Sequence, residues 1–223
     1  MSTYYYYCDG FFADDPSVYN NHLVSLSISA ELTCSRENQY LDPELPRDLD
    51  YSQKVTNEAQ FLADIGCNQQ DIYFNEHSLT KPEPDSIGCA IGSKQLTLKT
   101  ETGEDDDSYI LMPIIVRGLA YEAEWSGNFK LGESGPHQGF SEAADKVISS
   151  VTKYINSHDL TGKVKDGKVK FWIMGHSRAG ATTNIAGKRL TDTYGKDGNK
   201  VFAYAFEPPL CAPNPPTDLV NES

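Results

Sequence analysis

The segment from Phe171 to Gly180 constrains the fold of this chain more than any other. It reads Phe-Trp-Ile-Met-Gly-His-Ser-Arg-Ala-Gly, so an apolar run ends at a glycine, is followed by a serine and continues into small residues. Residues 181–190 then have a helical composition. This pattern is typical of a nucleophile elbow, a sharp strand-to-helix turn where a base and backbone N–H groups can reach a serine hydroxyl.

The small residues around Ser177 fit this interpretation. Gly175 and Ala179 stand at the two glycine positions of the Gly-x-Ser-x-Gly pattern, where larger side chains would collide as the helix turns back across the strand. Ala179 departs from the pattern, and Gly180 follows it directly. The alternative is a tight turn without chemistry, in which Ser177 only caps the helix.

A second segment upstream also ends in small residues. The β-branched run from Ile114 to Val116 predicts a buried strand that ends at Arg117 and Gly118. Taken alone, Arg117 would be interpreted as a solvated arginine at a strand end. The elbow that follows in the sequence favours a functional interpretation instead.

Five motifs occur along the chain in a defined order. They are Arg117-Gly-Leu119, Trp125-Ser-Gly-Asn128, His137-Gln-Gly-Phe140, the Gly-His-Ser-Arg elbow and Phe202-Ala-Tyr-Ala-Phe-Glu-Pro-Pro209. In this order they resemble the class 3 lipase-like α/β-hydrolases over residues 85–210, and the earlier part resembles the N-terminal extension of bacterial members. The resemblance implies a serine ester hydrolase without a cofactor, which acts on a small ester or lipid through an acyl-enzyme on Ser177.

The resemblance also implies an oxyanion hole built from the backbone N–H groups of Arg178 and Leu119. Such donors are fixed before the reaction, and losing one typically costs about 100-fold in rate. The family usually carries Thr or Ser at the position of Leu119, so that hydroxyl is missing here while the N–H is retained. Supporting roles are expected for residues around these two donors: Arg117, Gly118, His137, Gly175 and His176.

The acid and the base of a triad are harder to place. In α/β-hydrolases they follow the serine in the order Ser, acid, His, but every histidine precedes Ser177: His22, His77, His137, His158 and His176. Asp218 lies in a segment that superficially resembles the family's acid loop, although four prolines between 209 and 216 disfavour a strand leading to it.

Two interpretations follow from this arrangement. The first is the N-terminal part of a longer hydrolase, truncated before its acid and base and nearly inactive by itself. The second is a non-catalytic α/β-hydrolase-like fragment or binding domain. Neither His176 nor His137 is expected to be the base, because His176 is adjacent to Ser177 and should point away from it, and His137 opens a helix that supports the oxyanion loop.

Composition excludes several other classes. A net charge of −13 argues against nucleic acid and against an anionic membrane surface as partners. The acidic run from Glu104 to Asp107 is expected to be a solvated hairpin tip and not a metal site. The five cysteines are widely spaced without a Cys-x-x-Cys pair, which disfavours zinc and a disulfide framework. No apolar stretch approaches the roughly 20 residues of a membrane span, and no signal peptide is visible, so an intracellular location is slightly favoured.

The order of elements predicts an α/β fold, an α/β-hydrolase-like, mostly parallel sheet flanked by helices. Residues 1–84 are expected to form a helical extension packing on the core, with helices at 18–32 and 51–65, and residues 85–223 the core itself. A hairpin is expected from 87–90 and 95–99. Strands at 168–174 and 200–206 alternate with helices at 139–156 and 181–190, which requires parallel pairing. The edge beyond the last strand is expected to be uncovered and to permit self-association.

Overall fold

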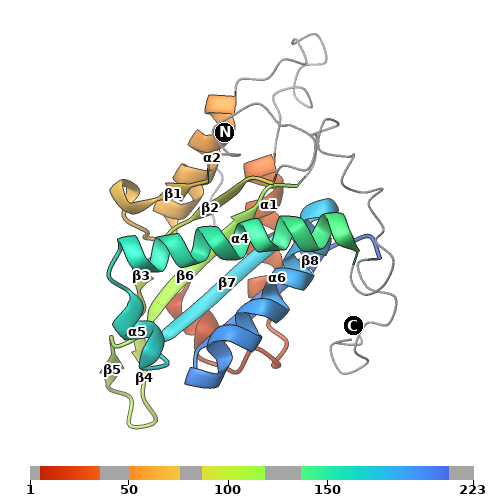
Figure 1. Ribbon diagram of the computed structural model, residues 1–223. Helices are drawn as coiled ribbons and strands as arrows, with labels where there is room; N and C mark the ends of the chain where they lie inside the picture. Colours follow the sequence, from red (N-terminus) through yellow and green to blue (C-terminus); the bar gives the residue numbers. More distant parts are fainter. Residues whose placement is uncertain (1–5, 36–50, 76–86, 119–136, 211–223) are drawn as a thin grey trace.

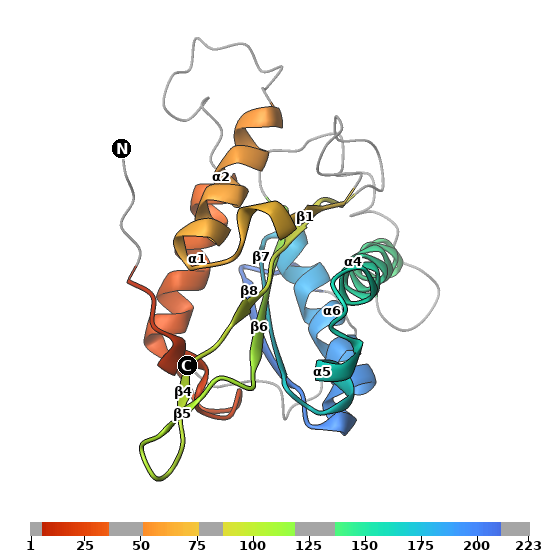
Figure 2. The ribbon, with the colours of Figure 1, turned by 90° about the vertical axis from the view of Figure 1, so that its left-hand side faces the viewer.

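A central sheet with helices on both faces organises the chain. The computed structural model describes residues 6–35, 51–75, 87–118 and 137–210. Helices α1 (Asn21–Ser35) and α2 (Tyr51–Asp64) cover one face, and α4 (Gln138–Ser157), α5 (Thr161–Lys165) and α6 (Arg178–Tyr194) cover the other (Figures 1 and 2). Short 3-10 turns lie at Asp9–Phe12, Gln69–Asp71 and Gly195–Asp197.

The sheet is mixed, with the strand order β1-β2-β6-β7-β8. Its strands are β1 (Tyr73–Phe74), β2 (Cys89–Ile91), β3 (Lys94–Gln95), β6 (Ile110–Val116), β7 (Val169–His176) and β8 (Lys200–Phe206). The last three pair in parallel, as the alternation of strands and helices predicted, whereas β1, β2 and β3 pair antiparallel. Among the described residues β8 pairs with β7 alone, and self-association through this edge stays a prediction.

The expected hairpin between residues 87–90 and 95–99 is wrong. Both β2 and β3 pair with β6 and not with each other, β2 opposite Ile114 to Val116 and β3 opposite Ile110 and Leu111. The seven-residue strand β6 is long enough to accept both along one edge. The hairpin forms one step later, between β4 (Leu98–Lys99) and β5 (Asp105–Asp106).

Strand β7 contributes side chains alternately to two hydrophobic cores. Phe171 and Ile173 join the core under α4 and α6, and Trp172 and Met174 join the core under α1 and α2. This is the two-residue period of a strand that is covered on both faces. The Trp172 indole N–H donates to Ser27 Oγ of α1 at 2.9 Å, so its one polar atom is satisfied inside the core.

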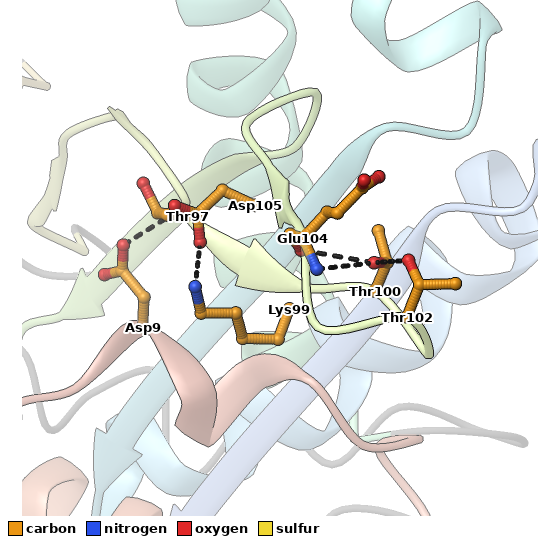
Figure 3. Close-up of polar contacts among 7 residues, drawn as sticks. All are labelled: Asp9, Thr97, Lys99, Thr100, Thr102, Glu104 and Asp105. Carbon is orange, nitrogen blue, oxygen red and sulfur yellow. Dashed lines mark hydrogen bonds and ion pairs between the residues drawn. The ribbon is translucent and has the colours of Figure 1, made fainter.

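Asp9 fastens the N-terminal segment to the sheet. Its carboxylate accepts hydrogen bonds from Lys94 Nζ at 2.7 Å, the Tyr7 hydroxyl at 2.8 Å and the Thr97 N–H at 2.9 Å. Burial alone would raise the pKa of Asp9, but these hydrogen bonds lower it below its usual value. Figure 3 shows Asp9 beside Thr97, at the base of the hairpin that Lys99 and Asp105 close.

Within the same hairpin, the Thr100 hydroxyl accepts from the Glu104 N–H at 3.1 Å, and Thr100 and Thr102 lie side by side (Figure 3). The acidic residues that follow are exposed or half-buried at the hairpin tip and on β5.

A buried asparagine holds three elements together at the opposite end of the sheet from the elbow. Asn199 Nδ2 donates to the carbonyl oxygens of Val164 and Tyr194, at 2.8 and 3.0 Å, and its Oδ1 accepts from the Val169 N–H at 2.9 Å. These bonds join α5, the end of α6 and the start of β7. The side chain therefore replaces backbone partners that the chain cannot supply there.

Asn199→Ala is expected to lower the free energy of unfolding by about 3 kcal/mol, because it leaves buried backbone groups without partners. Denaturant unfolding of the variant measures this loss. The matched control is Asn184→Ala on the exposed face of α6, where a change within about 0.5 kcal/mol is expected. Equal effects of the two substitutions would contradict the role given to Asn199.

Candidate active site

Ser177 lies at the junction of β7 and α6 in a strained conformation. Its φ is 55° and its ψ is −123°, in a region that residues other than glycine rarely adopt. It occupies the N-cap position of α6, yet its side chain makes no capping hydrogen bond. A serine that only capped the helix would have extended backbone and would accept from the helix N–H groups, so the capping alternative does not fit.

Glycines make this sharp turn sterically accessible. A Cβ at Gly175 would lie 2.4 Å from the Ala179 carbonyl oxygen and 2.5 Å from Thr183 Oγ1. A Cβ at Gly180 would lie 2.8 Å from the Phe206 carbonyl oxygen. The first turn of α6 therefore packs directly on the backbone of β7 and β8, and Gly175 and Gly180 both have to be small.

The end of β6 approaches the elbow equally closely. A Cβ at Gly118 would lie 2.4 Å from the His176 carbonyl oxygen and 3.2 Å from Ala179 Cβ. Gly118 thus leaves room for Ala179, the residue that departs from the glycine pattern. The Arg-Gly strand end and the serine turn, separated by almost 60 residues in the sequence, are brought into contact.

Of the two predicted oxyanion donors, the structure describes Arg178 but not Leu119. Arg178 is the first residue of α6, and the first-turn N–H groups of a helix precede its first internal hydrogen bonds. Leu119 lies outside the described residues, directly after Gly118. Asp218, the candidate acid, also lies outside them, as do His77 and the loop from 120 to 136.

Two of the residues expected to support the oxyanion hole, Arg117 and His137, are buried and not at the surface. Arg117 is buried, not solvated, and its N–H donates to the Gly88 carbonyl oxygen at 2.9 Å. His137 is buried at the N-cap position of α4, and its ring stacks on Phe140 with 4.1 Å between ring centroids. Both residues therefore belong to the framework around the strand ends.

The other described histidines have partners of their own. His22 stacks on Phe11 with 5.3 Å between ring centroids. His158 stacks on Tyr154 at the end of α4, which adjoins α5 and lies away from the start of α6 (Figure 1). His176 turns to the segment after β8, where its Nε2 lies 3.1 Å from Glu207 Oε2.

Glu207 was not identified from the sequence. It directly follows β8 and, like Ser177, has a positive φ, 45°. It lies within the Phe202 to Pro209 motif, but a charged residue at a strand end before two prolines is common in loops and does not by itself indicate a role. Only the parallel pairing of β7 with β8 shows that Glu207 and His176 end neighbouring strands.

The described part of the chain offers no ready metal site, since no three His, Cys, Asp or Glu side chains gather there. Within the same residues, no helix is long and apolar enough to cross a membrane.

A strained serine between a parallel strand and a helix, with a second strand end packed against it, is the geometry typical of a nucleophile elbow. In a comparison with known families, residues 115–221 match the family model described as lipase (class 3). This match covers the end of β6 through β8 and confirms the resemblance drawn from the five motifs. A search of curated proteins found no match, and neither did a search of solved structures.

Proposed function

We propose that the protein hydrolyses carboxylic esters through an acyl-enzyme on Ser177. The family match supports a lipase-type hydrolase in general. The observation that carries the serine mechanism is the backbone of Ser177, which is strained at φ 55° without a capping bond that would compensate. Strain of this kind is maintained at sites where a side chain has to be presented to a substrate.

In the proposed reaction Ser177 Oγ attacks the ester carbonyl carbon while a base takes its proton. The carbonyl oxygen becomes an oxyanion, which the N–H groups of Arg178 and Leu119 stabilise. The alcohol leaves with a proton, and water then cleaves the acyl-serine bond. The contact of Gly118 with His176 supports the role of Leu119, because Gly118 directly precedes Leu119 and is held beside the elbow.

The remaining parts of the triad follow the family order in this proposal. Asp218 is the candidate acid, and a histidine later in chain order would be the base. The proposal also treats residues 85–223 as the hydrolase core and residues 1–84 as an extension packed on it. The hydrophobic core that α1 and α2 share with Trp172 supports the packing of this extension on the core.

A non-catalytic binding domain is the second candidate. In this candidate function the fold and the serine turn are kept for binding, without catalysis. Both candidates predict binding of an ester or lipid, but only the first predicts turnover.

Hydrolysis of p-nitrophenyl esters of increasing acyl length separates the two functions. The test uses the protein in the length that its gene encodes. Turnover that a serine-directed phosphonate inhibits is expected for the hydrolase. Binding of the esters without release of p-nitrophenol would favour the binding domain.

A further inference from the structure

The ends of β7 and β8 are joined by a side-chain pair beside the serine. His176 Nε2 lies 3.1 Å from Glu207 Oε2, and only 14% of the His176 side chain is exposed whereas 84% of the Glu207 side chain is. In addition, the Ser177 N–H donates to the Phe206 carbonyl oxygen at 2.9 Å. Two adjacent residues of the elbow are therefore tied to Phe206, the last residue of β8, and to Glu207 directly after it.

The surroundings of the His176 ring indicate its protonation pattern. Nδ1 is buried and has no hydrogen-bond partner among the described residues. A proton on Nδ1 would be buried without an acceptor, which is costly. The arrangement therefore favours a neutral ring with its proton on Nε2, which donates to the Glu207 carboxylate.

His176 also contacts the opposite side of the site. Its carbonyl oxygen lies 2.4 Å from the position that a Cβ on Gly118 would take, just after β6. One residue thus touches the strand end that leads to Leu119 and, through its side chain, the strand end that carries Glu207. The ring of His176 therefore connects the residue next to Ser177 to Glu207, while its backbone packs beside Gly118.

From these contacts we propose that Glu207 is a positioning residue for Ser177, which it orients through the hydrogen bond from His176. The proposal rests on the proposed ester hydrolysis, since it concerns the reactivity of the same serine. The positive φ of Glu207 supports it, because glycine would adopt φ 45° without strain and yet a carboxylate-bearing residue stands there.

Two substitutions at this position distinguish the effect of the hydrogen bond from the effect of the backbone conformation. Glu207→Gln keeps an acceptor oxygen for the neutral ring, and the rate of Ser177 labelling by a fluorophosphonate is expected to stay within about twofold of the unmodified protein. Glu207→Gly removes the acceptor and relieves the backbone strain that the positive φ causes. Its labelling is expected to be about fivefold slower, the equivalent of one hydrogen bond, while its Tm stays the same or rises.

The matched control is Asp159→Gly. Asp159 is exposed, has φ 54° and lies just after α4, away from the elbow. This change relieves the same kind of strain and should leave the labelling rate unchanged. If Glu207 had a merely structural role, its substitution would lower the stability and the labelling rate together. Glu207→Gly should instead lower the labelling rate without lowering the Tm.

Long-range 1H–15N correlation spectra of the His176 ring give a readout that does not depend on folding of a variant. An unprotonated Nδ1 and a protonated Nε2 are expected in the unmodified protein. A protonated Nδ1 would overturn the proposal.

The labelling results distinguish this inference from the proposed function. Labelling of Glu207→Gly at the unmodified rate, or of Glu207→Gln as slowly as Glu207→Gly, would overturn the positioning role alone. Absence of labelling in the unmodified protein would overturn the ester hydrolase and the positioning role together.

Discussion

Ser177→Ala is expected to reduce ester hydrolysis about 10⁴-fold or more, to the level that binding and the oxyanion donors sustain without a nucleophile. Alanine removes the attacking oxygen and leaves the shape of the turn nearly unchanged. The measurement is kcat/KM for p-nitrophenyl butyrate, compared with that of the unmodified protein. Ser149→Ala is the matched control, because Ser149 is exposed on α4 and should be replaceable without loss.

The stability of a third variant strengthens this prediction. Ser177→Gly also lacks the hydroxyl, but glycine tolerates φ 55° without strain. This variant should therefore be as inactive as Ser177→Ala and more stable to heat. Substantial hydrolysis by either variant would show that another residue is the nucleophile.

Gly175→Ala is expected to destabilise the protein by about 3 kcal/mol and to disrupt the elbow. The added methyl group would lie 2.4 Å from a backbone oxygen of α6 and 2.5 Å from Thr183 Oγ1. Side-chain rotation can relieve the second contact but not the first, so the start of α6 has to move away from β7. Denaturant unfolding measures the loss of stability, and ester hydrolysis should fall with it.

Gly162→Ala is the control for this substitution. Gly162 lies in α5, and a Cβ there would have no atom within 4 Å. Alanine should stabilise a helix at such a position by roughly 0.5–1 kcal/mol. If Gly175→Ala were tolerated as well as Gly162→Ala, the close packing of α6 on β7 would be wrong.

The strand, turn and helix around Ser177 could be predicted because their causes are local. The apolar run of β7 has to be buried, and only small residues such as Gly175 allow the chain to turn back over it. The predicted parallel order of β7 and β8 follows from the helix between them. These features need no knowledge of distant parts of the chain.

Other features depend on contacts that no local pattern reveals. The failed hairpin at β2 and β3 illustrates this, because turn signals are present but the long edge of β6 competes for both strands. Arg117 is buried and its N–H donates to the distant Gly88, a contact that the local sequence does not identify. Glu207 acquires its partner only when β8 pairs in register beside β7, so that Phe206 lies opposite His176.

The proposed nucleophile is tested most directly by locating a covalent adduct. The protein in its gene-encoded length is treated with a fluorophosphonate and digested with trypsin, which releases Phe171–Arg178 as one peptide. The account predicts an adduct on Ser177 within this peptide, and no adduct in Ser177→Ala. An unmodified peptide, under conditions that label a known serine hydrolase in the same mixture, or an adduct on a different serine, would contradict it.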